Sequence, residues 1–397
     1  MIFSGWVGFY FGEQKLKVSF ANWKPGVVLN KQPILAGKPA DIDFSQFWTV
    51  WDMVSTKYVD KADIDTKKMV DGAISGMVAA LGDPYTVYLP VQQNKASKED
   101  LGGAFEGVGI QLGFDKNNYL SVVTPIDGSP AAKAGVRAGD IIVHIKDSIN
   151  NVDVSTDGIT LPGAVKLIKG KKGTHVVLTM VREGTDKPFD LDLVRDTIVV
   201  KSVTLEFKEI EGKKIAWIKL TRFGDLTQDE WNEAVTQIVT TDTKGVIVDV
   251  RNNPGGYLEG AVYIAGEFIP AGKVIVTQQS GDGSRIDNNV SRNGRLLDMK
   301  TVVIVNKGSA SAAEIFSGAL QDYKRAKVVG VQSFGKGSVQ EPIDFPDDSG
   351  IHITIAKWLR PSGAWIHKVG IKPDVEVKLG EDVTKDEQLD KALELFK

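Results

Sequence analysis

Cysteine is absent from the 397-residue chain, which excludes disulfide bonds and thiolate metal sites. Histidine is scarce as well, with four residues, and no two of them have the close spacing of a zinc motif. The formal net charge is only −3, so the composition gives no reason to expect nucleic acid as a partner. These absences argue against a thiolate or histidine metal site and against nucleic acid as a partner. We also expect that the protein needs no other metal and no organic cofactor.

A long hydrophobic run is also missing from the amino terminus, which we treat as a separate segment of residues 1–40. Residues Ile2 to Phe11 are apolar and aromatic, but they fall well short of the roughly 20 residues that cross a bilayer. No basic region precedes them, so the segment alone is not a signal peptide. The lysines that follow at Lys15 and Lys17 suit the interfacial end of a membrane anchor. A segment that docks on the protein is the alternative, and both readings stay open.

The length predicts two or three domains, and the apolar pattern changes twice along the chain. Residues 41–97 read as helical, because apolar stripes with helical spacing cover residues 44–58 and 70–81. Residues 98–199 contain short β-rich runs separated by Gly, Asp and Asn. Residues 200–397 alternate buried strands with helices, which argues for an α/β core. The overall fold class is therefore mixed α and β.

Three further segments support this division. The expected core strands include residues 215–220, 245–250, 301–305 and 326–331, and the expected core helices are residues 227–238, 258–268 and 312–323. Near the C-terminus, Thr384 and Glu387 have the spacing of a capping box, so we expect a final helix there. Its apolar face would pack on the core or on a second subunit of a homodimer.

Ser311 occupies the position of a nucleophile. It lies between the apolar run 301–305, which reads as a buried strand, and a helical pattern that begins at Ala312. At such a helix start, unpaired N–H groups and the positive end of the helix dipole favour a developing oxyanion. Ser309 is the neighbouring alternative.

A serine hydroxyl needs a base, and Lys336 is the best candidate in the chain. It stands between two glycines and follows Phe334. Burial among apolar neighbours could lower its pKa from about 10.4 toward the range of a general base. Gln340 could hold the neutral amine by a hydrogen bond without adding the negative charge of a carboxylate.

Two further segments could present backbone N–H groups to substrate. Gly255 and Gly256 follow a buried strand and could form an oxyanion hole together with the N–H of Ala312; the sequence does not choose between the two glycines. In the β-rich region, the N–H groups of residues Gly107, Val108 and Gly109 could face a terminal carboxylate. A peptide would then add to the strand that starts at Ile110, while a helix over residues 161–168 closes the groove.

These motifs resemble one family. GSASAAEI and FGKGSVQ are similar to the active-site strings of the carboxyl-terminal processing peptidases, Ser-Lys proteases with an inserted PDZ domain, and SPAAKAGVRAGDII resembles the PDZ insert. The resemblance implies Ser311 as nucleophile, Lys336 as base and Gln340 as its support. Asp322 holds the position of an acid described for some members, with an exposed helical aspartate as the alternative. Ala313 departs from the more usual serine.

The resemblance covers about residues 44–397 and implies a serine endopeptidase with an α/β core of crotonase- or Clp-like character. Its implied partners are C-terminal tails of unfolded or precursor proteins, and its implied location is periplasmic or otherwise extracytoplasmic, with membrane anchoring as a further expectation. Two rival functions remain. One is a PDZ-bearing peptide-binding protein without catalysis, and the other is a crotonase-like acyl-transfer enzyme.

Overall fold

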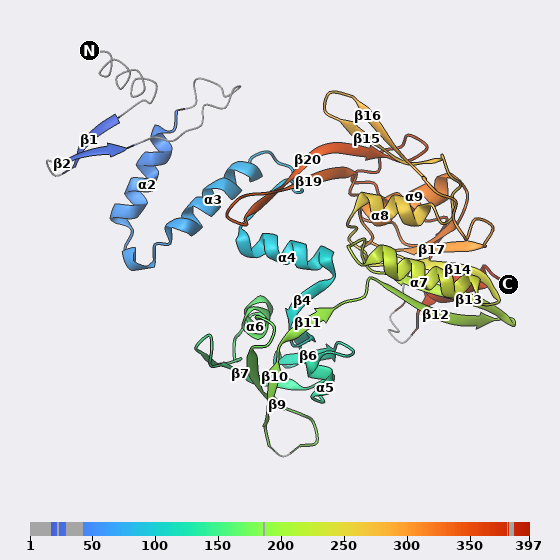
Figure 1. Ribbon diagram of the computed structural model, residues 1–397, viewed down its shortest axis with the longest axis horizontal. Coiled ribbons are helices and arrows are strands. Elements are labelled where there is room, and N and C mark those ends of the chain that lie inside the picture. The colour runs from blue at the N-terminus through green and yellow to red at the C-terminus, as the bar shows by residue number, and fades with distance from the viewer. Residues whose placement is uncertain (1–16, 22–23, 29–42, 186, 379, 381–384) are drawn as a thin grey trace, which may run out of the picture. The chain divides into compact units, whose positions relative to one another are not determined.

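The structure is a computed structural model that describes every residue except 1–16, 22–23, 29–42, 186, 379 and 381–384 (Figure 1). The chain divides into two compact units, residues 1–69 and 70–397, and each is described by itself. The apolar segment Ile2 to Phe11, predicted as part of a membrane anchor, lies outside the described residues. Within the described ranges, no helix combines the length and the apolar character that crossing a membrane requires.

The first unit contains an exposed aromatic helix. Strands β1 (Lys17–Ala21) and β2 (Lys24–Val28) pair antiparallel, and helix α2 (Ser45–Lys57) and the short 3₁₀ turn η1 (Lys61–Asp63) follow. The predicted apolar stripe is present on α2 and just before it, but Phe47 and Trp48 remain 39% and 60% exposed. Their rings contact each other edge to face at 5.1 Å.

A six-stranded sheet forms the centre of the second unit (Figure 1). Its order is β12-β13-β14-β17-β18-β21; β12 is antiparallel to β13, and the remaining neighbours are parallel. The strands are β12 (Val203–Ile210), β13 (Lys213–Leu220), β14 (Thr243–Asp249), β17 (Thr301–Val305), β18 (Lys327–Gly330) and β21 (Val375–Glu376). All five residues of β17 are buried, as expected for a strand covered on both faces.

Helices cover both faces of this sheet. Alternate side chains of a strand point to opposite faces, so Ile218 and Val248 pack with the helices α7 to α9, while Ile247 packs with α10. The bounds are α7 (Thr227–Val239), α8 (Leu258–Ala265), α9 (Ala312–Asp322) and α10 (Glu387–Glu394). The predicted α/β core is confirmed.

The start of the last helix was predicted wrongly. Asp386 caps α10 by accepting a hydrogen bond from the N–H of Leu389 at 3.0 Å. Glu387 is therefore the first helical residue and not the third, so it has no capping-box role; Thr384 lies outside the described residues. Leu389 of α10 and Phe396, which follows the helix, pack on the core of their own chain.

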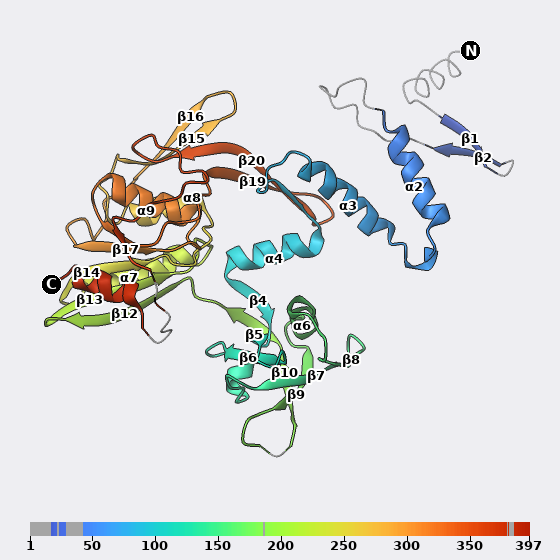
Figure 2. The same ribbon diagram turned by 180° about the vertical axis from the view of Figure 1, so that it is seen from behind.

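A second sheet stands next to helix α9 (Figures 1 and 2). It contains β16 (Arg285–Asn289), β15 (Val274–Ser280), β20 (Gly350–Leu359) and β19 (Ser338–Asp344) in this order, and β3 (Val87–Leu89) pairs with β20. The sequence analysis anticipated helix α3 (Thr66–Ala79) but missed β3 and helix α4 (Val91–Gly102). Residues that precede the β-rich insertion thus pair with a strand that lies about 260 positions later.

The β-rich insertion has its own apolar core and sheet. The sheet order is β10-β9-β7-β6-β5, which leaves β5 at an edge, and β8 pairs with β7. Its elements are β4 (Ala104–Gly107), β5 (Ile110–Phe114), β6 (Leu120–Pro125), α5 (Pro130–Lys133), β7 (Ile141–Asp147), β8 (Val152–Ser155), α6 (Leu161–Ile168), β9 (His175–Val181), β10 (Phe189–Val194) and β11 (Asp196–Val199). The incoming strand β4 pairs with the outgoing β11. The helix predicted over residues 161–168 is confirmed as α6; the domain limits 98 and 199 stay predictions.

Candidate active site

Ser311 lies at the turn between strand β17 and helix α9. Its backbone has φ 53° and ψ −117°, which is an unfavourable conformation for a residue other than glycine. The Ser311 N–H donates to Glu314 Oε2 at 2.9 Å, which stabilises this turn. A Cβ atom on Gly255 would come within 2.7 Å of Ser311 Cβ, so only glycine fits beside the serine.

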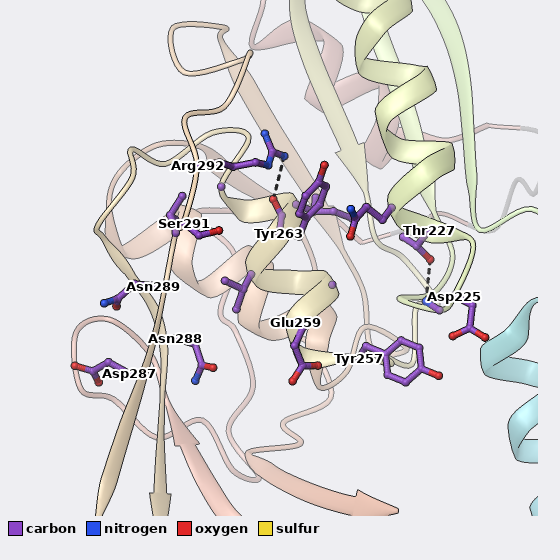
Figure 3. A pocket seen from close by; sticks show the side chains of 17 residues that line it. Asp225, Thr227, Tyr257, Glu259, Tyr263, Asp287, Asn288, Asn289, Ser291 and Arg292 are labelled. Carbon is purple, nitrogen blue, oxygen red and sulfur yellow. Dashed lines mark hydrogen bonds between the residues drawn. The ribbon is translucent and has the colours of Figure 1, made fainter.

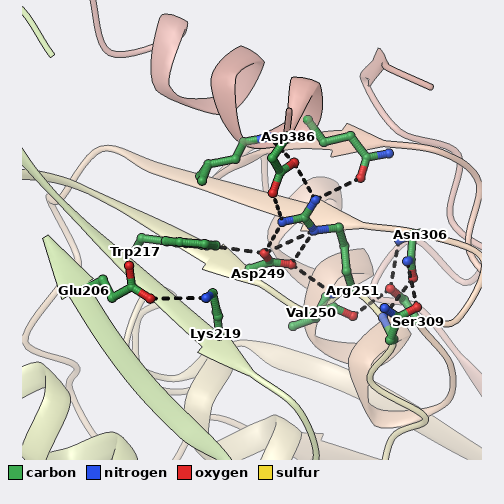
Figure 4. A network of polar contacts seen from close by, with 12 residues as sticks. Glu206, Trp217, Lys219, Asp249, Val250, Arg251, Asn306, Ser309 and Asp386 are labelled. Carbon is green, nitrogen blue, oxygen red and sulfur yellow. Dashed lines mark hydrogen bonds and ion pairs between the residues drawn. The ribbon is translucent and has the colours of Figure 1, made fainter. Parts of the chain in front are cut away.

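Ser309 has a different environment from Ser311. It is fully buried, and its hydroxyl donates to the Val250 carbonyl at 2.7 Å and accepts from the Asn306 N–H at 3.0 Å. The Ser309 hydroxyl therefore acts as both donor and acceptor, and these two hydrogen bonds hold the loop after β17 against the end of β14 (Figure 4). Ser311 instead lines a cavity of about 490 Å³.

The glycine-rich loop after β14 is held against the nucleophile turn. The Ala310 N–H donates to the Asn253 carbonyl at 2.9 Å, and the side chain of Asn253 accepts from the Gly255 N–H at 2.9 Å. Among the described residues, the N–H groups of Gly256 and Ala312 have no partner. The Ala312 nitrogen would lie 3.0 Å from a Cβ on Gly255, so these donors are close together.

An ion network fixes the start of the same loop (Figure 4). Arg251 is paired with Asp249 of β14 at 2.6 Å and with Asp386, the cap of α10, at 2.7 Å. Burial of the guanidinium acts against its charge, yet the hydrogen bonds that it donates to both carboxylates raise the pKa of Arg251 above its ordinary value. The C-terminal helix is thereby connected to the loop that carries Gly255.

Lys336 lines the same cavity as Ser311. Its backbone carbonyl accepts from Trp358 Nε1 at 2.9 Å, and its N–H donates to Glu314 Oε2 at 2.9 Å. Burial lowers the pKa of the Lys336 ammonium, while the negative charges of Asp83 and Glu314 raise it, and the net direction is downward. The side chains of Ser311 and Lys336, both within the described residues, do not hydrogen-bond to each other in this structure.

Glu314 connects the two segments that carry the serine and the lysine. Its carboxylate is fully buried and accepts from Ser311, from the Ser333 hydroxyl at 2.5 Å, and from the N–H groups of Gly335 at 2.7 Å and Lys336 at 2.9 Å. Burial raises the pKa of this carboxyl. The sequence analysis gave Glu314 no role, although the spacing Ser-x-x-Glu at a helix start is the pattern that would have indicated it.

The two remaining catalytic predictions have different surroundings. Gln340 lines the cavity, and its Nε2 donates to Ser338 Oγ at 2.9 Å and to Thr354 Oγ1 at 3.0 Å rather than contacting Lys336 by a hydrogen bond. Asp322 lies at the end of α9 in an ion pair with Arg360 and is not among the residues that line the cavity.

A second hollow, of about 740 Å³, adjoins the cavity that Ser311 and Lys336 line, and the two share Tyr257 and Glu259 (Figure 3). It lies between α7, α8 and β16. Its one lining arginine, Arg292, stacks over the ring of Tyr263 at 4.2 Å and is paired with the buried Glu267. Across the described part of the chain, no three His, Cys, Asp or Glu side chains gather in a way that could hold a metal ion.

The peptide-binding residues predicted in the β-rich domain lie at an open sheet edge. Gly109 has φ 76°, and a Cβ there would come within 2.3 Å of Ser129 Cβ, so the turn requires glycine. The N–H groups of Val108 and Gly109 have no partner among the described residues. Strand β5, from Ile110, has a neighbour only at β6 and faces helix α6, which is the arrangement that adds a peptide strand. Gly107 ends β4 opposite Asp196.

Comparisons with known proteins agree with this architecture. Residues 214–377 match the model of peptidase family S41, residues 121–182 match the PDZ domain, and residues 3–93 match the activating protease CtpB N-terminal domain.

Curated relatives and solved structures are similar over most of the chain. Carboxy-terminal processing protease CtpA of Bacillus subtilis is 38% identical over 355 residues, which cover 89% of this chain and 73% of the relative. Carboxy-terminal processing protease CtpB of the same organism is 33% identical and covers 95% and 76%. A solved photosystem II D1 C-terminal processing protease is 28% identical, with a TM-score of 0.51 over 87% of this chain and 96% of that one. The chain therefore belongs to the family of carboxy-terminal processing proteases, serine peptidases with a PDZ domain.

Proposed function

We propose that Ser311 and Lys336 carry out peptide-bond cleavage as nucleophile and general base. The single observation that supports these roles best is their position: although 25 residues apart in the sequence, both line one cavity, and burial lowers the pKa of the lysine. Ser311 Oγ forms a bond to the scissile carbonyl carbon as its proton moves to Lys336 Nζ. The same proton then passes to the leaving amine, and water hydrolyses the acyl-enzyme.

The oxyanion of the tetrahedral intermediate would accept from Gly256 and Ala312. The Gly255 N–H already donates to Asn253, whereas the Gly256 and Ala312 N–H groups have no partner among the described residues. Donors that are in place before the reaction stabilise developing charge without reorganisation. Gly256 is therefore our choice between the two glycines.

Gln340 would support the base through its amide oxygen. Its Nε2 donates to two hydroxyl groups, on Ser338 and Thr354, which fixes the orientation of the amide. The Oε1 atom is left to accept from Lys336 when the lysine turns toward Ser311. Hydrogen bonds of this kind are often absent before substrate binds.

The PDZ domain binds C-terminal peptides, and we propose that its occupants are tails of unfolded or precursor proteins. The free N–H groups of Val108 and Gly109 would hold the terminal carboxylate, and the edge of β5 would pair with the tail. Helix α4 lies between the two sites: it follows the catalytic segment β3, and its Asp100 lines the cavity while its Glu99 pairs with Lys169 beside α6 at 2.8 Å.

We also propose an extracytoplasmic location with membrane anchoring, and a homodimer that forms through α2. The exposed Phe44, Phe47 and Trp48 form an apolar patch on one helix that another copy of the chain could cover. Sedimentation of the full chain and of a variant with Trp48→Glu tests the dimer, and fractionation of cells that express the full gene tests the location.

The catalytic roles are tested with a serine-directed acylating probe and an unstructured peptide. We expect labelling at Ser311, loss of peptide cleavage in Ser311→Ala, and an equally large loss in Lys336→Arg, because a guanidinium stays protonated and cannot accept the serine proton. Labelling elsewhere would favour a crotonase-like acyl transferase, and no labelling would favour a peptide-binding protein without catalysis.

Tail capture is tested with the same peptide in two forms. Amidation of its C-terminal carboxylate should lower kcat/KM, since the amides at Val108 and Gly109 lose an anion. Equal kcat/KM values for both forms would contradict carboxylate capture while leaving the catalytic roles intact.

A further inference from the structure

The segment that precedes the PDZ insertion supplies a side chain to the catalytic base. Tyr85 is half-buried between α3 and β3, and Lys336 Nζ lies over its ring, 5.2 Å from the ring centroid. Strand β3 pairs with β20 at Val87 and His352, which fixes the segment against the catalytic sheet. Tyr85 thus approaches the lysine from a part of the chain about 250 residues away.

Hydrogen bonds and ring contacts hold Tyr85 in this position. Its N–H donates to Asp83 Oδ1 at 3.1 Å, and its ring meets His367 edge to face at 6.3 Å. His367 in turn stacks on Trp365 at 5.0 Å, and Trp365 Nε1 donates to the carbonyl of Gly337 at 2.7 Å. Through His367 and Trp365, the Tyr85 ring is therefore connected to Gly337, the residue after Lys336.

Several ionisable groups face Lys336 from different elements. Asp83 lies on the same segment as Tyr85, Glu314 is on α9, and His352 is on β20. Burial and the positive charge of Lys336 lower the pKa of His352, and burial raises the pKa of Tyr85 itself, so both are neutral near pH 7. The other acidic groups that line the cavity are Asp100, Glu259 and Glu341.

The Tyr85 ring has two opposing effects on the ammonium. Its electron-rich face attracts a cation, which favours the protonated lysine. The same ring excludes water, and loss of hydration can lower the pKa of a buried lysine by up to about 3–5 units. Burial lowers the pKa of Lys336 more than the negative charges of Asp83 and Glu314 raise it. Because the Tyr85 ring lies over the amine, we expect the exclusion of water to be the larger of its two effects.

We propose that Tyr85 is a positioning residue for the catalytic base: its ring covers the Lys336 amine, fixes its place in the cavity and keeps water from it. This inference rests on the proposed role of Lys336. It assigns a catalytic contribution to the GDPYT segment, residues 82–86, which lies outside the peptidase core in sequence but within its active site in space.

The test measures kcat/KM of an unstructured peptide against pH for wild type, Tyr85→Ala and Tyr85→Phe. In Tyr85→Ala, water reaches the amine, so the midpoint of the rise with pH should move up by about one unit, which lowers kcat/KM below the midpoint about tenfold. Tyr85→Phe keeps the ring and should restore the wild-type midpoint. Tyr88→Phe is the control for loss of a tyrosine hydroxyl, because Tyr88 lies on the adjacent strand β3 and its hydroxyl bonds to Asp71 at 2.9 Å.

A second readout follows the lysine without catalysis. In the Ser311→Ala background, lysines are methylated with ¹³C-formaldehyde and titrated by NMR, and the Lys336 signal is identified by its loss in Lys336→Arg. Tyr85→Ala should raise the titration midpoint of this signal. An unchanged midpoint, or an activity loss of equal size at every pH, would overturn the role of Tyr85. A wild-type rate that does not rise with pH would instead contradict the proposed base.

Discussion

Glu314→Gln tests whether one buried carboxylate holds the serine and the lysine in register. Oε1 accepts from Ser333 and Gly335, and Oε2 accepts from Ser311 and Lys336. Glutamine has nearly the same shape, but one of its two terminal atoms is an NH₂ group. Whichever way the glutamine amide is turned, its NH₂ group replaces one carboxylate oxygen. The two donors that bonded to that oxygen then have no acceptor.

The structure allows an estimate of the cost. Hydrogen bonds to a charged group contribute about 1.5–3 kcal/mol each, so losing two lowers the free energy of unfolding by about 3–6 kcal/mol. Burial raises the pKa of Glu314, which means that burying the charge is itself unfavourable. Glutamine avoids this penalty, so we expect a loss near the lower end of the range. Because a displacement of about 1 Å can cost 10²-fold in rate, kcat should fall at least that far.

The assay combines urea unfolding, followed by tryptophan fluorescence, with peptide cleavage at one pH. Glu394→Gln serves as the control, since Glu394 is exposed on α10 and pairs only with Lys391 there. Wild-type kcat in a folded Glu314→Gln protein would refute the argument that this carboxylate aligns the two catalytic segments. Unchanged stability would refute the estimate of the hydrogen-bond energies.

Three further substitutions have defined outcomes. Lys336→Met should raise the free energy of unfolding at neutral pH by about 1.4 kcal/mol per unit by which burial lowers the lysine pKa. The folded protein binds fewer protons at this lysine than the unfolded chain, so wild type should gain stability relative to the variant as pH rises toward the ordinary lysine pKa of 10.5. A stability difference that stays constant up to that pH would contradict burial of the amine. Asp386→Asn should cost about 1–3 kcal/mol and lower kcat through the oxyanion loop, and an effect on stability alone would disprove that connection. Gly255→Ala should abolish acylation of Ser311, because the added Cβ would collide with the serine. Gly272 also has a positive φ but open space around it, so Gly272→Ala should only destabilise the protein. Equal activity of the two variants would contradict this steric argument.

Local patterns predicted the elements of the site well. The strand at 301–305, the helix that begins at Ala312 and the groove helix at 161–168 are confirmed, because a buried run, a small-residue turn and an apolar stripe are all visible within about 15 residues. The family was also predicted correctly from its motifs. Local patterns failed at the start of α10, where Asp386 caps the helix and its carboxylate also pairs with the distant Arg251.

Contacts between distant segments could not be predicted in this way. The Arg251–Asp386 pair joins residues 135 positions apart, and the approach of Tyr85 to Lys336 spans an entire inserted domain. Neither pair has a periodic pattern or a motif in the sequence. The support of Lys336 by Gln340 stays a prediction; what the sequence did not indicate is that the hydroxyl groups of Ser338 and Thr354 accept from the amide nitrogen of Gln340.

The proposed catalytic groups therefore depend on three connections that lie outside their own motifs. Glu314 joins the serine turn to the lysine segment, Arg251 joins the oxyanion loop to the C-terminal helix, and Tyr85 covers the lysine from the segment before the insertion. Each connection crosses from one stretch of the chain to another, so none of the catalytic motifs has its active geometry in isolation. We therefore expect peptide cleavage to depend on the last helix and on the segment that leads into the PDZ domain, as well as on the catalytic motifs themselves.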